Sequence, residues 1–280
     1  MKRLHFCYEM SLKWDQRVKD HHFLIRCRPM ENGRQHREDM TIKIEPADFI
    51  SEGIDGFGNE GYMGSMRAPH DYLSVKAEGM VQVNVSGRTE PFHPMYRFPS
   101  AFTMPDESMD KFLKETWLEL GWPARNAADF AIKSCHMREK EYPPMAQNDL
   151  EYMMNRLYRR FVYAPGTTTV ATTAVEALAL GKGVCQDYAH VFISLCRLAG
   201  VPARYAAGMM LGEGASHAWV EVWMKDTWLG MDPTNNRLVD ETYIKLTHGR
   251  DFGDGTINRG RFLGFANQSQ EIRVKVEEMV

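Results

Sequence analysis

The sequence predicts an α+β protein, with an antiparallel β domain at residues 1–86 followed by a domain of helices and strands at residues 87–280. Two patterns carry this prediction. Short apolar runs alternate with turn-forming residues in the first part, and apolar residues take helical spacing in the second. With 280 residues, 44% of them hydrophobic and 25% charged, the chain can bury one large core or two modest ones. Two domains are the better expectation for this length.

Three short apolar segments indicate strands in residues 1–86. They are His22–Pro29, Met40–Ile44 and Leu73–Ala77. The turn-forming pair Asn32-Gly33 separates the first two, and the glycine-rich stretch 53–64 has no helical period. Because strands bounded by such turns pair with their neighbours, we expect an antiparallel β domain.

A proline-punctuated segment from Pro91 to Pro105 is the expected connector between the domains. After it, Asp106 or Ser108 can cap a helix that Gly121 would end. A second helix is predicted from Leu150 to Phe161, where apolar residues recur at spacings of three and four. Its apolar stripe fits a core position better than a cofactor site.

A third helix is predicted from Cys185 to Ala199, with Gly200 as its end. Cys185 then lies in the first turn, where partial positive charge and unpaired N–H groups favour a thiolate. Gly181 and Gly183 let the preceding backbone bend sharply and leave room for a substrate. The other role open to this cysteine is that of a small buried residue.

A β-hairpin is predicted from two strands, residues 217–223 and 228–232, joined by a turn near Lys225-Asp226. A two-residue turn sets the register, so that Asp232 lies opposite Trp219 and diagonal to His217. Side chains at diagonal positions are roughly 7–8 Å apart at their backbones and within reach of each other. The hairpin therefore brings Asp232 to His217.

Cysteine, histidine and aspartate have complementary roles in acyl chemistry. Asp232 would accept a hydrogen bond from one ring nitrogen of His217, leaving the other nitrogen to take the proton of Cys185. The intermediate would be a thioester. The alternatives are a histidine in an ordinary surface or core position and an aspartate that starts a turn before Pro233.

Net charge and cysteine content indicate which partners and which cellular compartment to expect. The net charge is −3, so nothing electrostatic favours nucleic acid or an anionic membrane, and a peptide or protein substrate is the expected partner. No apolar run is long enough to cross a bilayer, and the N-terminus does not resemble an export signal. Five cysteines without a CxxC pair suit free thiols in a reducing compartment, so we expect a cytoplasmic protein.

Several blocks of sequence resemble the bacterial transglutaminase-like superfamily, in the order found in that family. They are Gly183–His190, Gly200–Tyr205, Ser216–Val222 and Gly230–Asn236. Asp55–Asn59 resembles a motif of the β domain that precedes this core in many members, and Gly249–Phe252 resembles the loop after it. The likeness covers nearly the whole chain and is strongest from Tyr163 to Phe265, and the core of the second domain is expected at about residues 150–265.

The resemblance implies a papain-like, transglutaminase-core catalytic domain, with Cys185 as nucleophile, His217 as general base and Asp232 as orienting group. The expected activity is acyl transfer from peptide or isopeptide amides, with hydrolysis by a cysteine protease or amidase ahead of cross-linking. Tyr163 is a candidate second oxyanion donor beside the backbone N–H of Cys185 by its place in the family pattern; its alternative role is a packed aromatic.

Two further residues have expected supporting roles. Asp187 would stabilise the start of the cysteine helix, and Trp219 would wall or support the cleft. No cofactor or metal is expected. A metal site made of Cys185, His190 and His217 is disfavoured, because no pair has zinc spacing and His190 takes another helix face. A non-catalytic peptide-binding protein on the same fold is the alternative outside enzymes.

Overall fold

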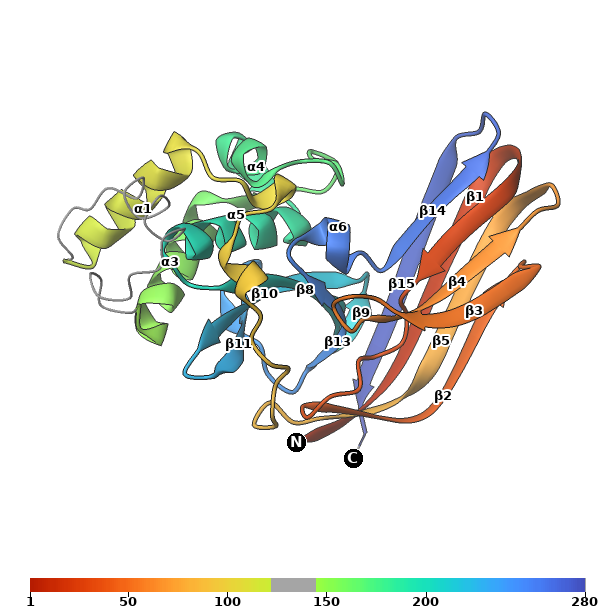
Figure 1. Ribbon diagram of the computed structural model, residues 1–280, viewed down its shortest axis with the longest axis horizontal. Coiled ribbons are helices and arrows are strands. Elements are labelled where there is room, and N and C mark those ends of the chain that lie inside the picture. Colours follow the sequence, from red (N-terminus) through yellow and green to blue (C-terminus); the bar gives the residue numbers. More distant parts are fainter. Residues whose placement is uncertain (122–144, 280) are drawn as a thin grey trace.

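The computed structural model describes residues 1–121 and 145–279, and it confirms the α+β class. An eight-stranded sheet forms one end of the molecule, most helices form the other, and a five-stranded sheet lies between them (Figure 1). Among the described residues, no helix has the length and apolarity that a bilayer crossing requires.

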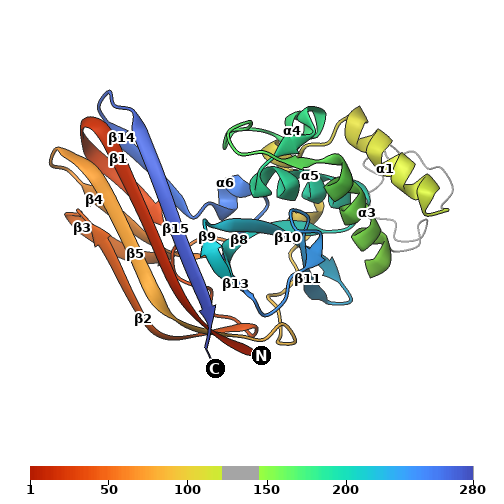
Figure 2. The ribbon, with the colours of Figure 1, turned by 180° about the vertical axis from the view of Figure 1, so that it is seen from behind.

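The eight-stranded sheet is built around the long central strand β1, and Figure 2 shows the same sheet from behind. Its strands are β1 (Lys2–Ile25), β2 (Gln35–Glu45), β3 (Phe49–Ile54), β4 (Glu60–Met66), β5 (His70–Val83), β9 (Gly212–Gly214), β14 (Asn258–Leu263) and β15 (Gln268–Glu278). The main order is β2-β5-β1-β15-β9, while β4 and β14 pair with the far end of β1 and β3 pairs with β4. All of these pairs are antiparallel, as predicted.

Two strands from the end of the chain correct the expected domain boundaries. Strands β14 and β15, which the division at residue 87 assigns to the second domain, both pair with β1. In this pairing Val276 lies opposite Phe6 and Val274 lies opposite Tyr8, and all four side chains are buried. Alternation in a strand shows which face is buried but not which partner it pairs with, so the sequence pattern could not reveal this return.

The helices begin and end close to the predicted positions. They are α1 (Glu107–Glu119), α3 (Gln147–Arg160), α4 (Ala174–Leu180), α5 (Cys185–Leu198) and α6 (Phe252–Gly255), with 3-10 turns η1 (Pro94–Arg97) and η2 (Ala101–Thr103) in the connector. Asp106 caps α1 by accepting from the N–H groups of Ser108 and Met109, and Gly121 follows its end with φ of 73°. Helix α4 was not predicted, although Thr173 and Glu176 form its capping box.

The five-stranded sheet holds the predicted hairpin. Its strands are β8 (Ala203–Met210), β10 (His217–Met224), β11 (Thr227–Asp232), β12 (Arg237–Leu238) and β13 (Tyr243–Gly249), in the order β12-β11-β10-β8-β13. The predicted register is confirmed, since Met224 pairs with Thr227 across a two-residue turn. Lys225 and Asp226 both have positive φ, as a type I′ hairpin turn requires.

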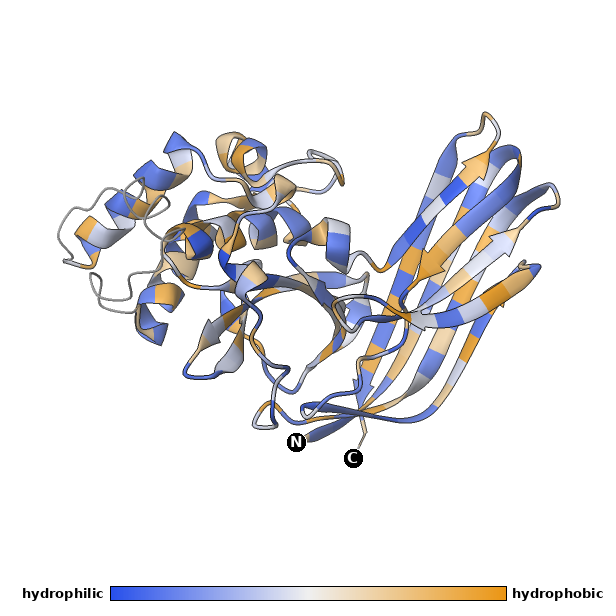
Figure 3. Ribbon diagram, viewed as in Figure 1, coloured by the Kyte–Doolittle hydropathy of each residue, from blue (hydrophilic) through white to orange (hydrophobic). Residues whose placement is uncertain are grey.

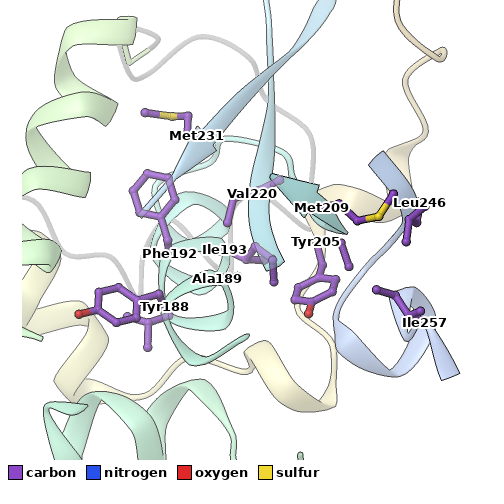
Figure 4. Packing of buried hydrophobic residues seen from close by; sticks show 14 of the residues in the cluster. Tyr188, Ala189, Phe192, Ile193, Tyr205, Met209, Val220, Met231, Leu246 and Ile257 are labelled. Carbon is purple, nitrogen blue, oxygen red and sulfur yellow. The ribbon is translucent and has the colours of Figure 1, made fainter. Parts of the chain in front are cut away.

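Helix α5 packs on one face of the five-stranded sheet. Phe192 and Ile193 of the helix lie with Val220 and Met231 of the sheet in a cluster of fully buried side chains (Figure 4). The helix is buried on nearly every side, from Gln186 to its end. It therefore holds Cys185 at a fixed place relative to β10 and β11.

The loop between β3 and β4 joins the eight-stranded sheet to the five-stranded one. Asn59 exchanges two 2.8 Å hydrogen bonds with the backbone of His248 in β13. Asp55 accepts from Asn59 at 2.9 Å and from the guanidinium of Arg26 at 2.7 Å. The Asp55–Asn59 motif thus docks the eight-stranded sheet onto strand β13 of the five-stranded sheet.

Candidate active site

Cys185 is the first residue of α5, at the junction predicted from the glycines before it. The short strand β7 (Lys182–Gly183) pairs in parallel with β6 (Val162–Tyr163) and leads directly into the helix. Asp187, the third residue of the helix, accepts from the N–H of Val184 at 2.7 Å. A Cβ at Gly183 would lie 2.4 Å from the carboxylate of Asp187, so only glycine fits there.

Asp187 is buried at the start of α5. Besides the backbone of Val184, its Oδ2 accepts from the hydroxyl of Thr168 at 2.7 Å. Burial raises the pKa of Asp187, and these two hydrogen bonds act in the opposite direction. The carboxylate ties the loop that carries Thr168 to the start of the cysteine helix.

His217 and Asp232 meet across the hairpin, as the register predicted. Nε2 of His217 lies 2.8 Å from Oδ2 of Asp232. Nδ1 is the ring nitrogen that the carboxylate does not use, and the negative charge of Cys185 acts on the same ring. His217 is thus bonded to Asp232 and interacts electrostatically with Cys185.

The charge state of His217 follows from these contacts. Burial acts to lower the pKa of His217, but the hydrogen bond to Asp232 and the interactions with Asp232 and Cys185 raise it to about 9. Burial likewise acts to raise the pKa of Asp232, and its hydrogen bonds lower it below the ordinary value. At neutral pH the ring is therefore protonated and the carboxylate ionised.

Tyr163 lies near Cys185, because β6 pairs with the strand that leads into the helix. Burial, followed by the charge of Cys185, raises the pKa of Tyr163 above its ordinary value. Its side chain is about half exposed. A tyrosine that keeps its proton can donate a hydrogen bond next to the sulfur.

Trp219 supports the site from inside rather than walling an open cleft, since only 1% of its surface is exposed. Its ring stacks near that of His217, with centroids 6.4 Å apart, and makes an edge contact with Tyr243. Gly208, opposite His217 in β8, has no room for a Cβ, which would lie 2.9 Å from the Trp219 ring and 1.9 Å from the backbone of Ile244.

His190 is separate from the site and does not join Cys185 and His217 in a ligand set. It is fully buried, and its Nε2 accepts from the N–H of Phe252 at 3.1 Å. Burial, with a contribution from Arg197, lowers the pKa of His190 to about 3, so the ring is neutral. Within residues 1–121 and 145–279 no three histidine, cysteine or acidic residues gather as metal ligands.

Comparison with known proteins assigns both halves of the chain. Residues 137–233 match the transglutaminase-like superfamily, and residues 4–82 match the bacterial transglutaminase-like N-terminal region. An uncharacterised protein of Mycobacterium bovis is 31% identical over 244 residues, which cover 79% of this chain and 74% of that protein. The chain belongs to the transglutaminase-like superfamily.

Two more relatives bear on this transglutaminase-like chain. A crystal structure described as a candidate cysteine protease from Cytophaga hutchinsonii has a TM-score of 0.74 at 20% identity, covering 100% of this chain and 92% of that one. That likeness shows the fold. A protein-glutamine gamma-glutamyltransferase of Pseudomonas aeruginosa is 26% identical over 163 residues, which cover 51% of this chain and 23% of that protein.

Two polar residues of this transglutaminase-like site were not predicted. Asn235 and Tyr243 both donate to Oδ2 of Asp232, at 2.7 and 2.8 Å. Asn235 was within reach of sequence reasoning, since it follows Asp232 by three residues in the Gly230–Asn236 block. Nothing in the sequence marks Tyr243, because β13 reaches the site only by pairing with β8.

Proposed function

We propose that the chain is a cysteine-dependent acyl-transfer enzyme that acts on peptide or isopeptide amide bonds through a thioester, with water as the usual acceptor. One observation carries the proposal: His217 is hydrogen-bonded to Asp232, and Asp232 and Cys185 together raise its pKa to about 9. An imidazolium held beside a thiol at a helix N-terminus favours the thiolate, which is the nucleophilic form.

In the first step the Cys185 thiolate attacks the amide carbon and the carbonyl oxygen takes the negative charge. The His217 imidazolium then donates its proton to the leaving amine, the C–N bond breaks, and the acyl group remains on sulfur. In the second step neutral His217 removes a proton from water, which attacks the thioester and releases the acid. Asp232 keeps the ring oriented and stabilises its charged form throughout.

The oxyanion needs two hydrogen-bond donors. The backbone N–H of Cys185, at the first position of α5, has no partner within its own helix and is the first donor. The hydroxyl of Tyr163 is the second donor we propose, supported by its electrostatic contact with Cys185 and its raised pKa. Tyr163→Phe should lower turnover by on the order of 100-fold to 1,000-fold, as loss of a single oxyanion donor does elsewhere.

Cross-linking of proteins is the second candidate function. The named activity of the Pseudomonas aeruginosa relative favours it, although the matched segment is only 23% of that protein. Hydrolysis and cross-linking share the thioester and differ in whether water or an amine attacks it. Incubation with a glutamine-bearing protein and a labelled primary amine, beside a peptide and isopeptide substrate panel, distinguishes the two.

Selective alkylation of the cysteines tests the nucleophile without a known substrate. The pKa of Cys27 is raised to about 12 by burial, and burial also raises the pKa of Cys196 and Cys7. Limited iodoacetamide treatment at pH 6, followed by peptide mapping, should therefore label Cys185 first. Cys135 lies outside the described residues, and the same map reports on it.

His217→Ala is the matched control for that experiment. Without the imidazolium, the thiol of Cys185 loses the neighbouring positive charge that favours its ionisation. At pH 6 its alkylation should be more than about tenfold slower than in the wild type. Equal rates in the two proteins would remove His217 from the mechanism and make a non-catalytic peptide-binding protein the better explanation.

The expected partner and location stay proposals. A peptide or protein substrate fits the acyl chemistry proposed for Cys185. A reducing cytoplasm fits the four described cysteines, all of which are free thiols.

A further inference from the structure

Asp232 accepts more hydrogen bonds than are needed to orient one histidine. Its Oδ2 accepts from three side chains: Nε2 of His217 at 2.8 Å, Nδ2 of Asn235 at 2.7 Å and the hydroxyl of Tyr243 at 2.8 Å. Its Oδ1 accepts from the backbone N–H groups of Thr234 and Asn235, at 3.0 and 3.2 Å. A carboxylate has about four lone-pair sites, so five donors saturate it.

The position of Asp232 is already fixed without Tyr243. The two backbone N–H groups and the Asn235 amide all come from the three residues that follow Asp232, and together they hold both carboxylate oxygens. Tyr243 instead comes from the start of β13, and its side chain is buried against Trp219. The tyrosine hydroxyl must therefore contribute something other than the rotamer of the carboxylate.

We propose that Tyr243 is a positioning residue of the triad whose hydroxyl takes up part of the charge of Asp232 and thereby limits how tightly the aspartate holds the proton on His217. The proposal deepens the acyl-transfer function and rests on it. It gives a residue of β13, outside the three triad positions, a role in setting how readily His217 releases its proton.

The physical argument concerns competition for one oxygen. A hydroxyl that donates to Oδ2 stabilises the ionised carboxylate and reduces the negative potential that reaches the ring on the other side. Asp232 without Tyr243 would attract the His217 proton more strongly. Because His217 must give that proton to the leaving amine in the first step, an imidazolium held too tightly is a poor general acid.

Other charged groups near the pair do not replace this contact. Cys185 faces His217 from α5, and Arg237 of β12 lies over the Tyr243 ring, 5.3 Å from its centroid. Arg237 is itself paired with Asp240, at 2.6 Å, so the two charges largely cancel at the site. Among the described residues, the groups that bond to Asp232 side-chain oxygens are the five named above.

Tyr243→Phe tests the proposal, because phenylalanine keeps the packing and removes only the hydroxyl. The measurement is the pH titration of the His217 ring C–H signal by NMR, assigned from its absence in His217→Ala. The wild type should titrate near pH 9, since the pKa of His217 is raised to about 9. In Tyr243→Phe the midpoint should move upward by about half a pH unit.

Tyr8→Phe is the matched control. Tyr8 is fully buried in the eight-stranded sheet, and its hydroxyl has no partner among the described residues. Its removal should leave the His217 midpoint unchanged. A purely structural role for Tyr243 would lower thermal stability and likewise leave the midpoint in place, so an unmoved or lowered midpoint in Tyr243→Phe overturns the proposal.

A second variant covers the case in which Tyr243→Phe does not fold. Asn235 is exposed and donates to the same oxygen, so Asn235→Ala should raise the His217 midpoint in the same direction. No rise in that variant also overturns the proposal. A wild-type midpoint near 6.5, the ordinary value for histidine, would instead overturn the acyl-transfer function itself, which keeps the two failures distinct.

Discussion

The two large sheets of this protein differ in how many of their faces meet water. In β1 the buried residues Leu4, Phe6, Tyr8 and Met10 alternate with exposed or half-exposed ones, so the eight-stranded sheet is wet on one face, and Figure 3 shows the alternation as bands along its strands. All seven residues of β13 and seven of the eight in β8 are buried. The five-stranded sheet is covered on both faces, and it carries the candidate active site.

The covered sheet nevertheless contains charges, which need partners inside the protein. Arg204 of β8 bonds to Glu221 of β10 and to Glu90, which precedes the connector, both at 2.6 Å, and it lies over the ring of Trp228. Lys245 of β13 binds the same two carboxylates at 2.9 to 3.1 Å. The comparison teaches that a sheet covered on both faces can hold charged side chains when each buried charge has a partner of opposite sign.

Breaking that balance should give the largest effect. Arg204→Met keeps a side chain of similar length but leaves two buried carboxylates with a single cation. The free energy of unfolding should fall by about 3–5 kcal/mol, measured by urea denaturation. The double variant Arg204→Met with Glu221→Leu removes one charge of each sign and should recover much of the loss. If the single variant loses less than the double, the cluster is not balanced as described.

An intermediate effect should come from the buried neutral histidine of α5. The pKa of His190 is lowered to about 3, so below pH 6.5 the unfolded chain binds a proton that the folded chain does not. The free energy of unfolding therefore does not depend on His190 protonation above about pH 6.5, and it decreases as the pH falls from 6.5 toward 3. Between pH 6.5 and pH 5 the loss is about 2 kcal/mol.

His190→Gln should abolish this loss, because glutamine can still accept from the N–H of Phe252 but does not titrate. The quantity to compare is the difference in unfolding free energy between pH 7 and pH 5, in the variant and in the wild type. His22→Gln, at an exposed position of β1, is the matched control and should leave that difference unchanged. An equal acid sensitivity in His190→Gln and wild type would contradict the assignment.

The smallest effect is expected on the wet face of the eight-stranded sheet. Lys76 of β5 pairs with Glu9 and Glu78 at 3.6 and 3.3 Å, and its side chain is about half exposed. Lys76→Met should change the unfolding free energy by less than about 1 kcal/mol, because exposed ion pairs gain little in water. A loss comparable to that of Arg204→Met would mean that the two sheets do not differ as their burial indicates.

Local patterns in the sequence were sufficient for the parts of the site that lie close together along the chain. The hairpin register follows from a two-residue turn, and it correctly predicted the contact between His217 and Asp232. The start of α5 at Cys185 follows from the glycines before it and the apolar spacing after it. Both depend on residues within about fifteen positions of each other.

Contacts between distant segments were beyond such patterns. The contact of Tyr243 with Asp232 depends on β13 pairing with β8, and the ion pair of Arg204 with Glu90 joins residues 114 positions apart. Strand β9 was not predicted either. It has three exposed residues, lies just before the strand of His217 in the chain, and pairs with the distant strand β15. Pairing between remote strands is decided by the tertiary fold, and one strand pattern fits many partners.

The pairing of β1 with β15 also has a consequence for the synthesis of the protein. The partner of one edge of β1, strand β5, has been synthesised by residue 83. The partner of the other edge, strand β15, begins about 185 residues later, at Gln268. At 5–20 residues per second, a ribosome needs roughly 10–40 s to make that stretch. During this time that edge of β1 is unpaired, so nascent chains that stall before β15 is made should be the form most prone to aggregate or to bind chaperones.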